Sequence, residues 1–146
     1  MSRKRKILIV EDNEPFRQNT RELLEFHQFD VITAENGQEA LEMGAVFEPD
    51  LILSDIKMPV MNGFKMLRHL RRKKLFPHSR FVFLSGYSER KSIQAALKLG
   101  ADDYIVKPFT EEELVSKLKR LLGILIFPLF QINDIAQVIL IPGWTY

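Results

Sequence analysis

The sequence contains no cysteine, which excludes disulfide bonds and thiolate metal sites in this chain and fits a reducing compartment. It has no large excess of charge of one sign. The formal net charge is only +2, so no general attraction to nucleic acid is expected. It also lacks a long apolar run near its start, because the apolar residues 7–10 are followed by two acids and are too few for a signal-peptide core. These absences predict a soluble cytoplasmic protein.

The composition is that of an ordinary globular domain, with 46% hydrophobic and 27% charged residues in a chain of 146. Short apolar or β-branched segments alternate with segments of helical periodicity, and we count five of each. This alternation predicts a doubly wound α/β fold with a five-stranded parallel sheet and five helices. The predicted strands are 7–10, 29–34, 51–53, 81–84 and 104–106, and the predicted helices are about 15–27, 36–48, 64–74, 88–100 and 110–122.

Polar residues at three helix starts have side chains suited to capping. We expect Asn36, Ser88 and Thr110 to act as N-caps. In the helix after Ser88, the side chains expected to face the sheet are Ile93, Ala96 and Leu97. The basic run 71–74 ends the third helix, where cations are favoured by the helix dipole, so we interpret it as a solvated helix end.

Side chains able to bind metal and phosphate follow four of the predicted strands. Glu11 and Asp12 follow the first strand, Asp55 the third, Ser85 the fourth and Lys107 the fifth. In a parallel sheet these strand ends lie at one rim, where such folds bind ligands. Three carboxylates packed together repel one another, and a hard divalent cation such as Mg²⁺ would relieve that repulsion. The sequence therefore predicts an Mg²⁺ site at this rim.

This set of groups suits phosphoryl transfer. Asp55 is the expected nucleophile, because a carboxylate can attack phosphorus to give an aspartyl-phosphate. Lys107 would hold one phosphoryl oxygen and Ser85 would donate a hydrogen bond to another. Two simpler roles stay open from the residues alone: Asp55 as a turn cap and Lys107 as an ion-pair partner that neutralises the acids.

Four groups of residues form a recognisable set of motifs: Glu11-Asp12, Asp55-Ile-Lys-Met-Pro with Asn62-Gly63, Ser85-Gly86, and Gly100 to Phe109. Through these motifs, residues 6 to about 122 resemble the receiver domain of two-component response regulators. The resemblance implies a flavodoxin-like strand order of 2-1-3-4-5, and we set the receiver domain at 1–122.

The resemblance also implies residue roles. Asp55 would be the phosphoacceptor, and the backbone carbonyl of Lys57 would join Glu11 and Asp12 around Mg²⁺. Ser85 and Lys107 would contact the phosphoryl group. Tyr104 would be the aromatic switch residue that turns inward when Ser85 moves. The bond between Lys107 and Pro108 is expected to be cis, a form nearly confined to X-Pro bonds.

The partners implied by the resemblance are a sensor histidine kinase or phosphotransfer protein, which donates a phosphoryl group from phosphohistidine, and a downstream protein target. We expect no turnover on an external substrate and no direct contact with nucleic acid or membrane. Two alternatives stay open. One is a receiver-like scaffold that is never phosphorylated. The other is a phosphohydrolase with an Asp nucleophile, which would need a second Asp where Lys57 stands.

Residues 123–146 lie beyond the receiver pattern and are strongly apolar. Polar residues interrupt this tail, so it is a poor membrane span, and it is too short for a DNA-binding output domain. Two readings remain: the tail packs on the receiver or mediates a homodimer, or it is the start of a longer protein. We favour packing or self-association, because exposed apolar surface tends to find a partner.

Overall fold

The computed structural model describes residues 3–124. The prediction for the apolar tail therefore lies almost wholly outside the described residues. Within residues 3–124, every helix is too short or too polar to cross a lipid bilayer.

Five strands alternate with five helices along the described part of the chain, as the sequence predicts. The elements are β1 (Lys6–Val10), α1 (Glu14–Phe26), β2 (Asp30–Ala34), α2 (Gly37–Phe47), β3 (Leu51–Ser54), α3 (Gly63–Lys73), β4 (Arg80–Ser85), α4 (Arg90–Lys98), β5 (Asp103–Val106) and α5 (Glu111–Leu121).

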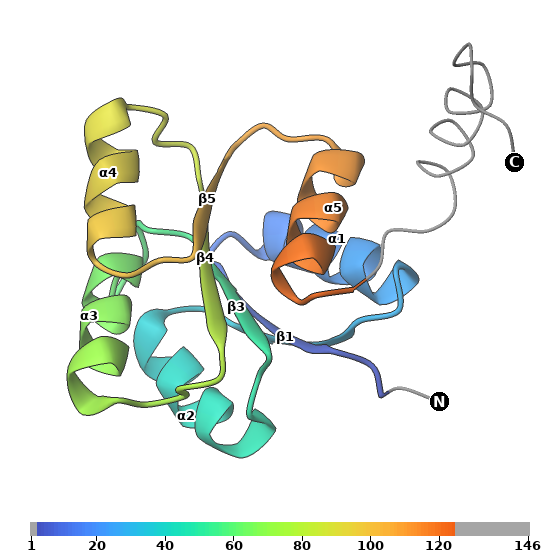
Figure 1. The fold of residues 1–146 in the computed structure, drawn as a ribbon, viewed down its shortest axis with the longest axis horizontal. Coiled ribbons are helices and arrows are strands. Elements are labelled where there is room, and N and C mark those ends of the chain that lie inside the picture. The colour runs from blue at the N-terminus through green and yellow to red at the C-terminus, as the bar shows by residue number, and fades with distance from the viewer. Residues whose placement is uncertain (1–2, 125–146) are drawn as a thin grey trace, which may run out of the picture.

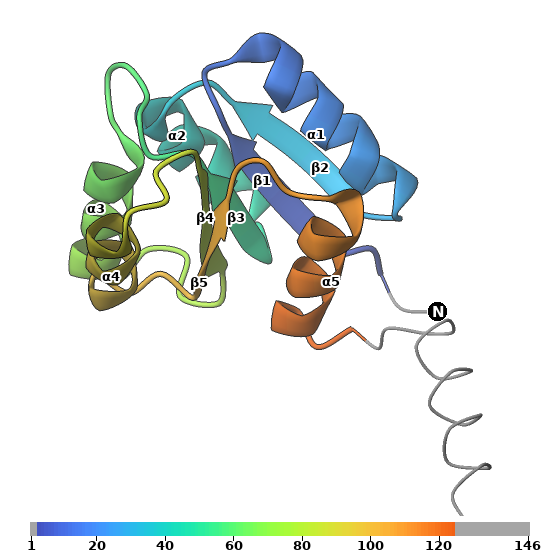
Figure 2. The same ribbon diagram turned by 90° about the horizontal axis from the view of Figure 1, so that it is seen from above.

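The strands form one parallel sheet in the order β2-β1-β3-β4-β5. Helices α2, α3 and α4 cover one face, and α1 and α5 cover the other (Figures 1 and 2). The prediction of a doubly wound fold with this strand order is thus confirmed. Every crossover brings the chain back to the side of the sheet where the strands begin. The carboxyl ends of all five strands therefore lie together at the opposite rim.

The central strands are buried on both faces, which explains their unbroken apolar runs. Alternate residues of β1 point to opposite sides: Leu8 packs with the α2–α4 layer, whereas Ile7 and Ile9 pack with α1 and α5. Strand β4 does the same with Phe83 and Val82. Two cores therefore hold the sheet between them and fix the position of its rim.

The predicted helix starts are confirmed at two of three positions. Asn36 accepts a hydrogen bond from the Glu39 amide at 2.9 Å, and Thr110 caps α5 through the Glu113 amide at 3.1 Å. The prediction for Ser88 is wrong, because α4 begins at Arg90 and Ser88 lies one residue before the N-cap position, outside the reach of the first-turn amides.

The inner face of α4 also differs from the prediction. Ala96 is buried and Ile93 packs against the core, but Leu97 is 46% exposed. Leu97 lies 100° further round the helix than Ala96, and this helix of nine residues buries only a narrow stripe.

The Lys107–Pro108 bond is cis, as predicted.

Candidate functional site

Strand register brings the predicted site residues to one place. Val10 of β1 pairs with Ser54 of β3, so that the residues following them, Glu11 and Asp55, emerge side by side. Ser85 of β4 pairs with Val106 of β5, which places Lys107 just beyond the same rim. Residues separated by as many as 96 positions in sequence thus reach one another.

Asp55 is held where β3 ends. Its Oδ1 accepts a hydrogen bond from the Ile56 amide at 2.7 Å. The turn that follows folds back tightly, with the Gly63 amide donating to the Ile56 carbonyl at 2.8 Å. A Cβ at Gly63 would lie 2.3 Å from the Asp55 carbonyl oxygen, so the close approach requires glycine. The glycine after Asn62 is therefore part of what positions the Asp55 carboxylate.

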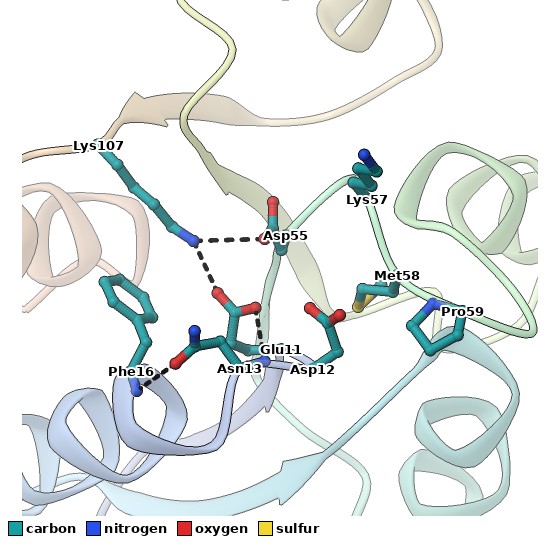
Figure 3. A pocket seen from close by; sticks show the side chains of 9 residues that line it. All are labelled: Glu11, Asp12, Asn13, Phe16, Asp55, Lys57, Met58, Pro59 and Lys107. Atoms are coloured by element: carbon teal, nitrogen blue, oxygen red, sulfur yellow. Dashed lines mark hydrogen bonds and ion pairs between the residues drawn. The ribbon is translucent and has the colours of Figure 1, made fainter.

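The ammonium group of Lys107 bridges two of the carboxylates (Figure 3). Its Nζ lies 2.7 Å from Glu11 Oε1 and 3.3 Å from Asp55 Oδ2. The side chains of Lys107 and Asp55 keep 22% and 16% exposure, whereas that of Glu11 keeps 4%. Asp55 is thus reachable from solvent while Glu11 is nearly enclosed.

Hydrogen bonds hold both the backbone and the side chain of Glu11. Arg17, itself buried, donates from Nη1 to the Glu11 backbone carbonyl at 2.9 Å. The Asn13 amide donates to Glu11 Oε2 at 3.2 Å. Burial raises the pKa of Glu11; the hydrogen bond from Lys107 opposes that rise and the nearby charge of Asp55 adds to it.

Three carboxylates at this rim form a group that could hold a metal ion. Glu11, Asp12 and Asp55 each offer an oxygen, and these atoms lie within 4.8 Å of one another. Carboxylate oxygens are hard ligands that suit Mg²⁺, and the cavity beside them leaves room for water and phosphate oxygens. Lys107 pairs with two of the three acids, so the group keeps an excess of negative charge that a divalent cation would offset.

The carboxylates line an open cavity of about 720 Å³. Phe16 and Lys107 form one side, and the turn with Lys57, Met58 and Pro59 forms the other (Figure 3). The side chain of Lys57 points away from the carboxylates in this view. The role predicted for its backbone carbonyl stays a prediction.

Ser85 lies at the end of β4 but does not line the cavity. Its side chain is buried, and its Oγ accepts a hydrogen bond from the Tyr87 amide at 3.2 Å. Tyr104 is also buried, with its hydroxyl donating to the Tyr87 carbonyl at 2.6 Å. Burial raises the pKa of the Tyr104 phenol, an effect opposed by the neighbouring Ser85 hydroxyl. The two predicted switch residues are therefore linked through one loop.

Sequence reasoning missed Arg17 and the contact made by Phe16. Arg17 occupies the same helical stripe as the buried Thr20 and Leu24, so a charge in an inward stripe was the available signal. The Phe16 ring packs against the Lys107 ammonium, with 4.1 Å between Nζ and the ring centroid. No local pattern predicts that contact, since the two residues are far apart in sequence.

Comparisons with known proteins agree on what the chain is similar to. A family model described as the response regulator receiver domain matches residues 7–119. The alkaline phosphatase synthesis transcriptional regulatory protein PhoP of Bacillus subtilis is 38% identical over 119 residues, which cover 81% of this chain and 48% of PhoP. This chain thus spans about half the length of the curated relatives it matches.

Solved structures show the same similarity. Chemotaxis response regulator CheY4 of Vibrio cholerae aligns with a TM-score of 0.74 and 32% identity, covering 80% of this chain and 98% of CheY4. The BeF3-activated N-terminal receiver domain of Klebsiella pneumoniae RstA aligns with a TM-score of 0.75 and 31% identity, covering 80% of this chain and 97% of that one.

Proposed function

Since the chain belongs to the response regulator receiver domain family, the phosphorylation-switched modules of two-component signalling, we propose that Asp55 takes up the phosphoryl group. The observation that carries this proposal is the meeting of Asp55 with Lys107 and two further carboxylates in one solvent-open cavity. We assign the receiver to residues 1–122.

In the proposed reaction, a carboxylate oxygen of Asp55 attacks the phosphorus of a phosphohistidine. A P–O bond forms as the P–N bond breaks, and the electron pair of that bond stays on the leaving imidazole nitrogen. Donors of this kind occur on sensor histidine kinases and phosphotransfer proteins, which are the partners we propose. The receiver would promote this transfer to itself, acting as a signalling protein rather than a classical enzyme.

The residues around Asp55 have separate parts in this proposal. Lys107 is already 3.3 Å from Asp55 Oδ2 and carries a compact positive charge, so it would hold a phosphoryl oxygen. Glu11, Asp12 and Asp55, with the backbone carbonyl of Lys57, would hold Mg²⁺, which when bound would neutralise charge on the transferring group. Arg17 and Asn13 would keep Glu11 in place to contact both Lys107 and Mg²⁺.

The signal would leave the site through Ser85 and Tyr104. If the Ser85 hydroxyl moves to a phosphoryl oxygen, it gives up the Tyr87 amide, and the loop that also accepts the Tyr104 hydrogen bond must rearrange. A shift between two arrangements of α4, β5 and α5 would then alter a protein-binding surface. The downstream target is proposed to be a protein.

Intact-mass measurement after incubation with acetyl phosphate and Mg²⁺ tests the proposal. We expect an adduct of one phosphoryl group that is absent from Asp55→Asn and present in the matched variant Asp50→Asn, whose carboxylate lies outside the cavity. A wild-type chain that gains no mass, or an Asp55→Asn chain that gains the same mass, would contradict it.

Calorimetric titration with Mg²⁺ tests the metal part separately. Asp12→Asn removes one charged ligand, and we expect it to weaken Mg²⁺ binding by about tenfold or more, since hard cations depend on carboxylate charge. Glu14→Gln is the control, because Glu14 is an exposed acid two residues away that does not line the cavity. Equal affinities for the wild type and Asp12→Asn would exclude this site.

A further inference from the structure

We propose that Phe16 is a positioning residue for phosphoryl transfer, whose ring holds the Lys107 ammonium group beside Asp55. This proposal rests on the function proposed above. The Phe16 ring centroid lies 4.1 Å from Lys107 Nζ, a distance at which a cation is attracted to the electron-rich face of an aromatic ring. The ring also lines the cavity that contains the carboxylates (Figure 3).

The Lys107 ammonium has three N–H donors and two carboxylate partners. Glu11 and Asp55 accept from it at 2.7 and 3.3 Å. The Phe16 ring covers a further side of the same nitrogen. Because lysine is a flexible chain with freely rotating donors, a fixed ring narrows the positions its charge can occupy.

The ring itself is held firmly at the start of α1. The Phe16 amide donates to the Asn13 side chain at 2.9 Å, and Pro15 restricts the backbone in the same turn. The Phe109 ring meets Phe16 edge-on, with 6.1 Å between centroids and an interplanar angle of 86°. The turn that supplies Glu11 and Asp12 therefore also presents a rigid aromatic face to Lys107.

This arrangement matters when the phosphoryl group arrives. Lys107 must then contact a phosphoryl oxygen while it stays near Glu11, which requires only a small movement of its ammonium group. A ring face attracts the cation over a broad area, so the contact can persist through that movement. Without the ring, the ammonium group would spend more time turned toward water and less time beside Asp55.

The test compares Phe16→Leu, which keeps an apolar side chain without a ring face, with Phe16→Tyr, which keeps the ring. Phe26→Leu is the matched control, since Phe26 lies on the same helix with 76% exposure and does not line the cavity. The first readout is the rate of adduct formation from acetyl phosphate and Mg²⁺. We expect Phe16→Leu to be about threefold to tenfold slower, as the strength of such contacts implies, with Phe16→Tyr and Phe26→Leu close to wild type.

The second readout is independent of phosphoryl transfer. A proton above an aromatic face resonates upfield, so the ε-methylene protons of Lys107 should be shifted upfield in the wild type and Phe16→Tyr but not in Phe16→Leu. Unshifted protons in the wild type would overturn the proposal, even if Phe16→Leu failed to fold. Equal adduct rates for the wild type and Phe16→Leu, or equal losses in the Leu and Tyr variants, would overturn the role of Phe16 while leaving the phosphoacceptor in place. A wild type that forms no adduct would overturn both proposals.

Discussion

The hydroxyl of Tyr104 donates a hydrogen bond of 2.6 Å to the backbone carbonyl of Tyr87. This bond joins the middle of β5 to the loop that begins after β4. The same loop supplies the Tyr87 amide, which donates a hydrogen bond to the Ser85 hydroxyl oxygen. One short segment thus connects the buried aromatic side chain with the hydroxyl proposed to sense phosphate.

We expect Tyr104→Phe to lower the free energy of unfolding by about 1 kcal/mol, because it removes one hydrogen bond and keeps the buried ring. Urea unfolding measures the change. Tyr87→Phe is a matched control, since Tyr87 takes part through its backbone carbonyl and keeps that bond whatever its side chain. If Tyr104→Phe is as stable as the wild type, the bond contributes nothing to the resting state.

Gly63→Ala is expected to destabilise the fold by about 1–3 kcal/mol or more, because overpacking forces backbone and side chains apart. The added Cβ would meet the Asp55 carbonyl oxygen at 2.3 Å and the Phe83 ring at 2.8 Å. The usual preference of helices for alanine over glycine, about 1 kcal/mol, would not offset this clash.

Urea unfolding of Gly63→Ala should be compared with that of Gly86→Ala. A Cβ at Gly86 meets nothing within 4 Å, so this change should leave stability within about 0.5 kcal/mol of wild type. Equal stabilities for the two alanine variants would show that the turn after Asp55 can relax.

The sequence was sufficient to predict the sheet and the position of the acids. Residues 7–10 and 51–53 are unbroken apolar runs, the first followed directly by Glu11 and the second by Ser54 and then Asp55, and such short runs are typical of strands buried on both faces. Once the strands are parallel, Glu11 and Asp55 must share a rim. This inference needs no knowledge of side-chain contacts, which is why it succeeded.

Side-chain partners were harder to predict. The burial of Arg17 depends on the Glu11 carbonyl, a backbone group that carries no signal in the sequence. Leu97 and Ala96 both fit an apolar stripe at helical spacing, but the packing of α4 against the sheet buries Ala96 and leaves Leu97 exposed. Ser88 and Glu89 are both next to the start of α4, and helix ends of this kind vary by one or two residues.

Stability should depend on pH through Asp50. The Arg3 guanidinium, with two hydrogen bonds of 2.8 Å to the carboxylate, holds the pKa of Asp50 below its usual value. A depressed pKa means that the unfolded chain binds the proton more tightly, so this contribution is complete above the unfolded pKa and is lost as pH falls through the folded pKa. We therefore expect Asp50→Asn to be less stable than wild type near neutral pH.

That difference in stability should shrink as the pH falls below about 4. Urea unfolding of the wild type and Asp50→Asn across this range measures it. Asp30→Asn is the comparison variant, because Asp30 is an exposed acid at the start of β2, just as Asp50 directly precedes β3. A difference that stays constant with pH would mean that the Asp50 charge is not what stabilises the fold.

Arg17 should be important for both stability and the site. Arg17 is buried, and its Nη1 donates a hydrogen bond of 2.9 Å to the Glu11 carbonyl. Its Nη2 lies 3.7 Å from Glu35 Oε1. Arg17→Met keeps much of the apolar stem but leaves the Glu11 carbonyl without this donor. We expect the free energy of unfolding to fall by about 1–3 kcal/mol, the cost of leaving a buried polar group without its partner.

The matched control for Arg17→Met is Arg21→Met, one turn along α1. Arg21 pairs with Glu25 on its own helix at 2.7 Å, and the two side chains keep 40% and 48% exposure. Such a pair contributes about 0.3–0.5 kcal/mol, so its loss should be small. Arg17→Met should also slow adduct formation from acetyl phosphate, because a freed Glu11 holds Lys107 less firmly, whereas Arg21→Met should not. If both variants react at the wild-type rate and lose similar stability, then Arg17 serves only the packing of α1, and the Glu11 backbone is held by the β1 strand without it.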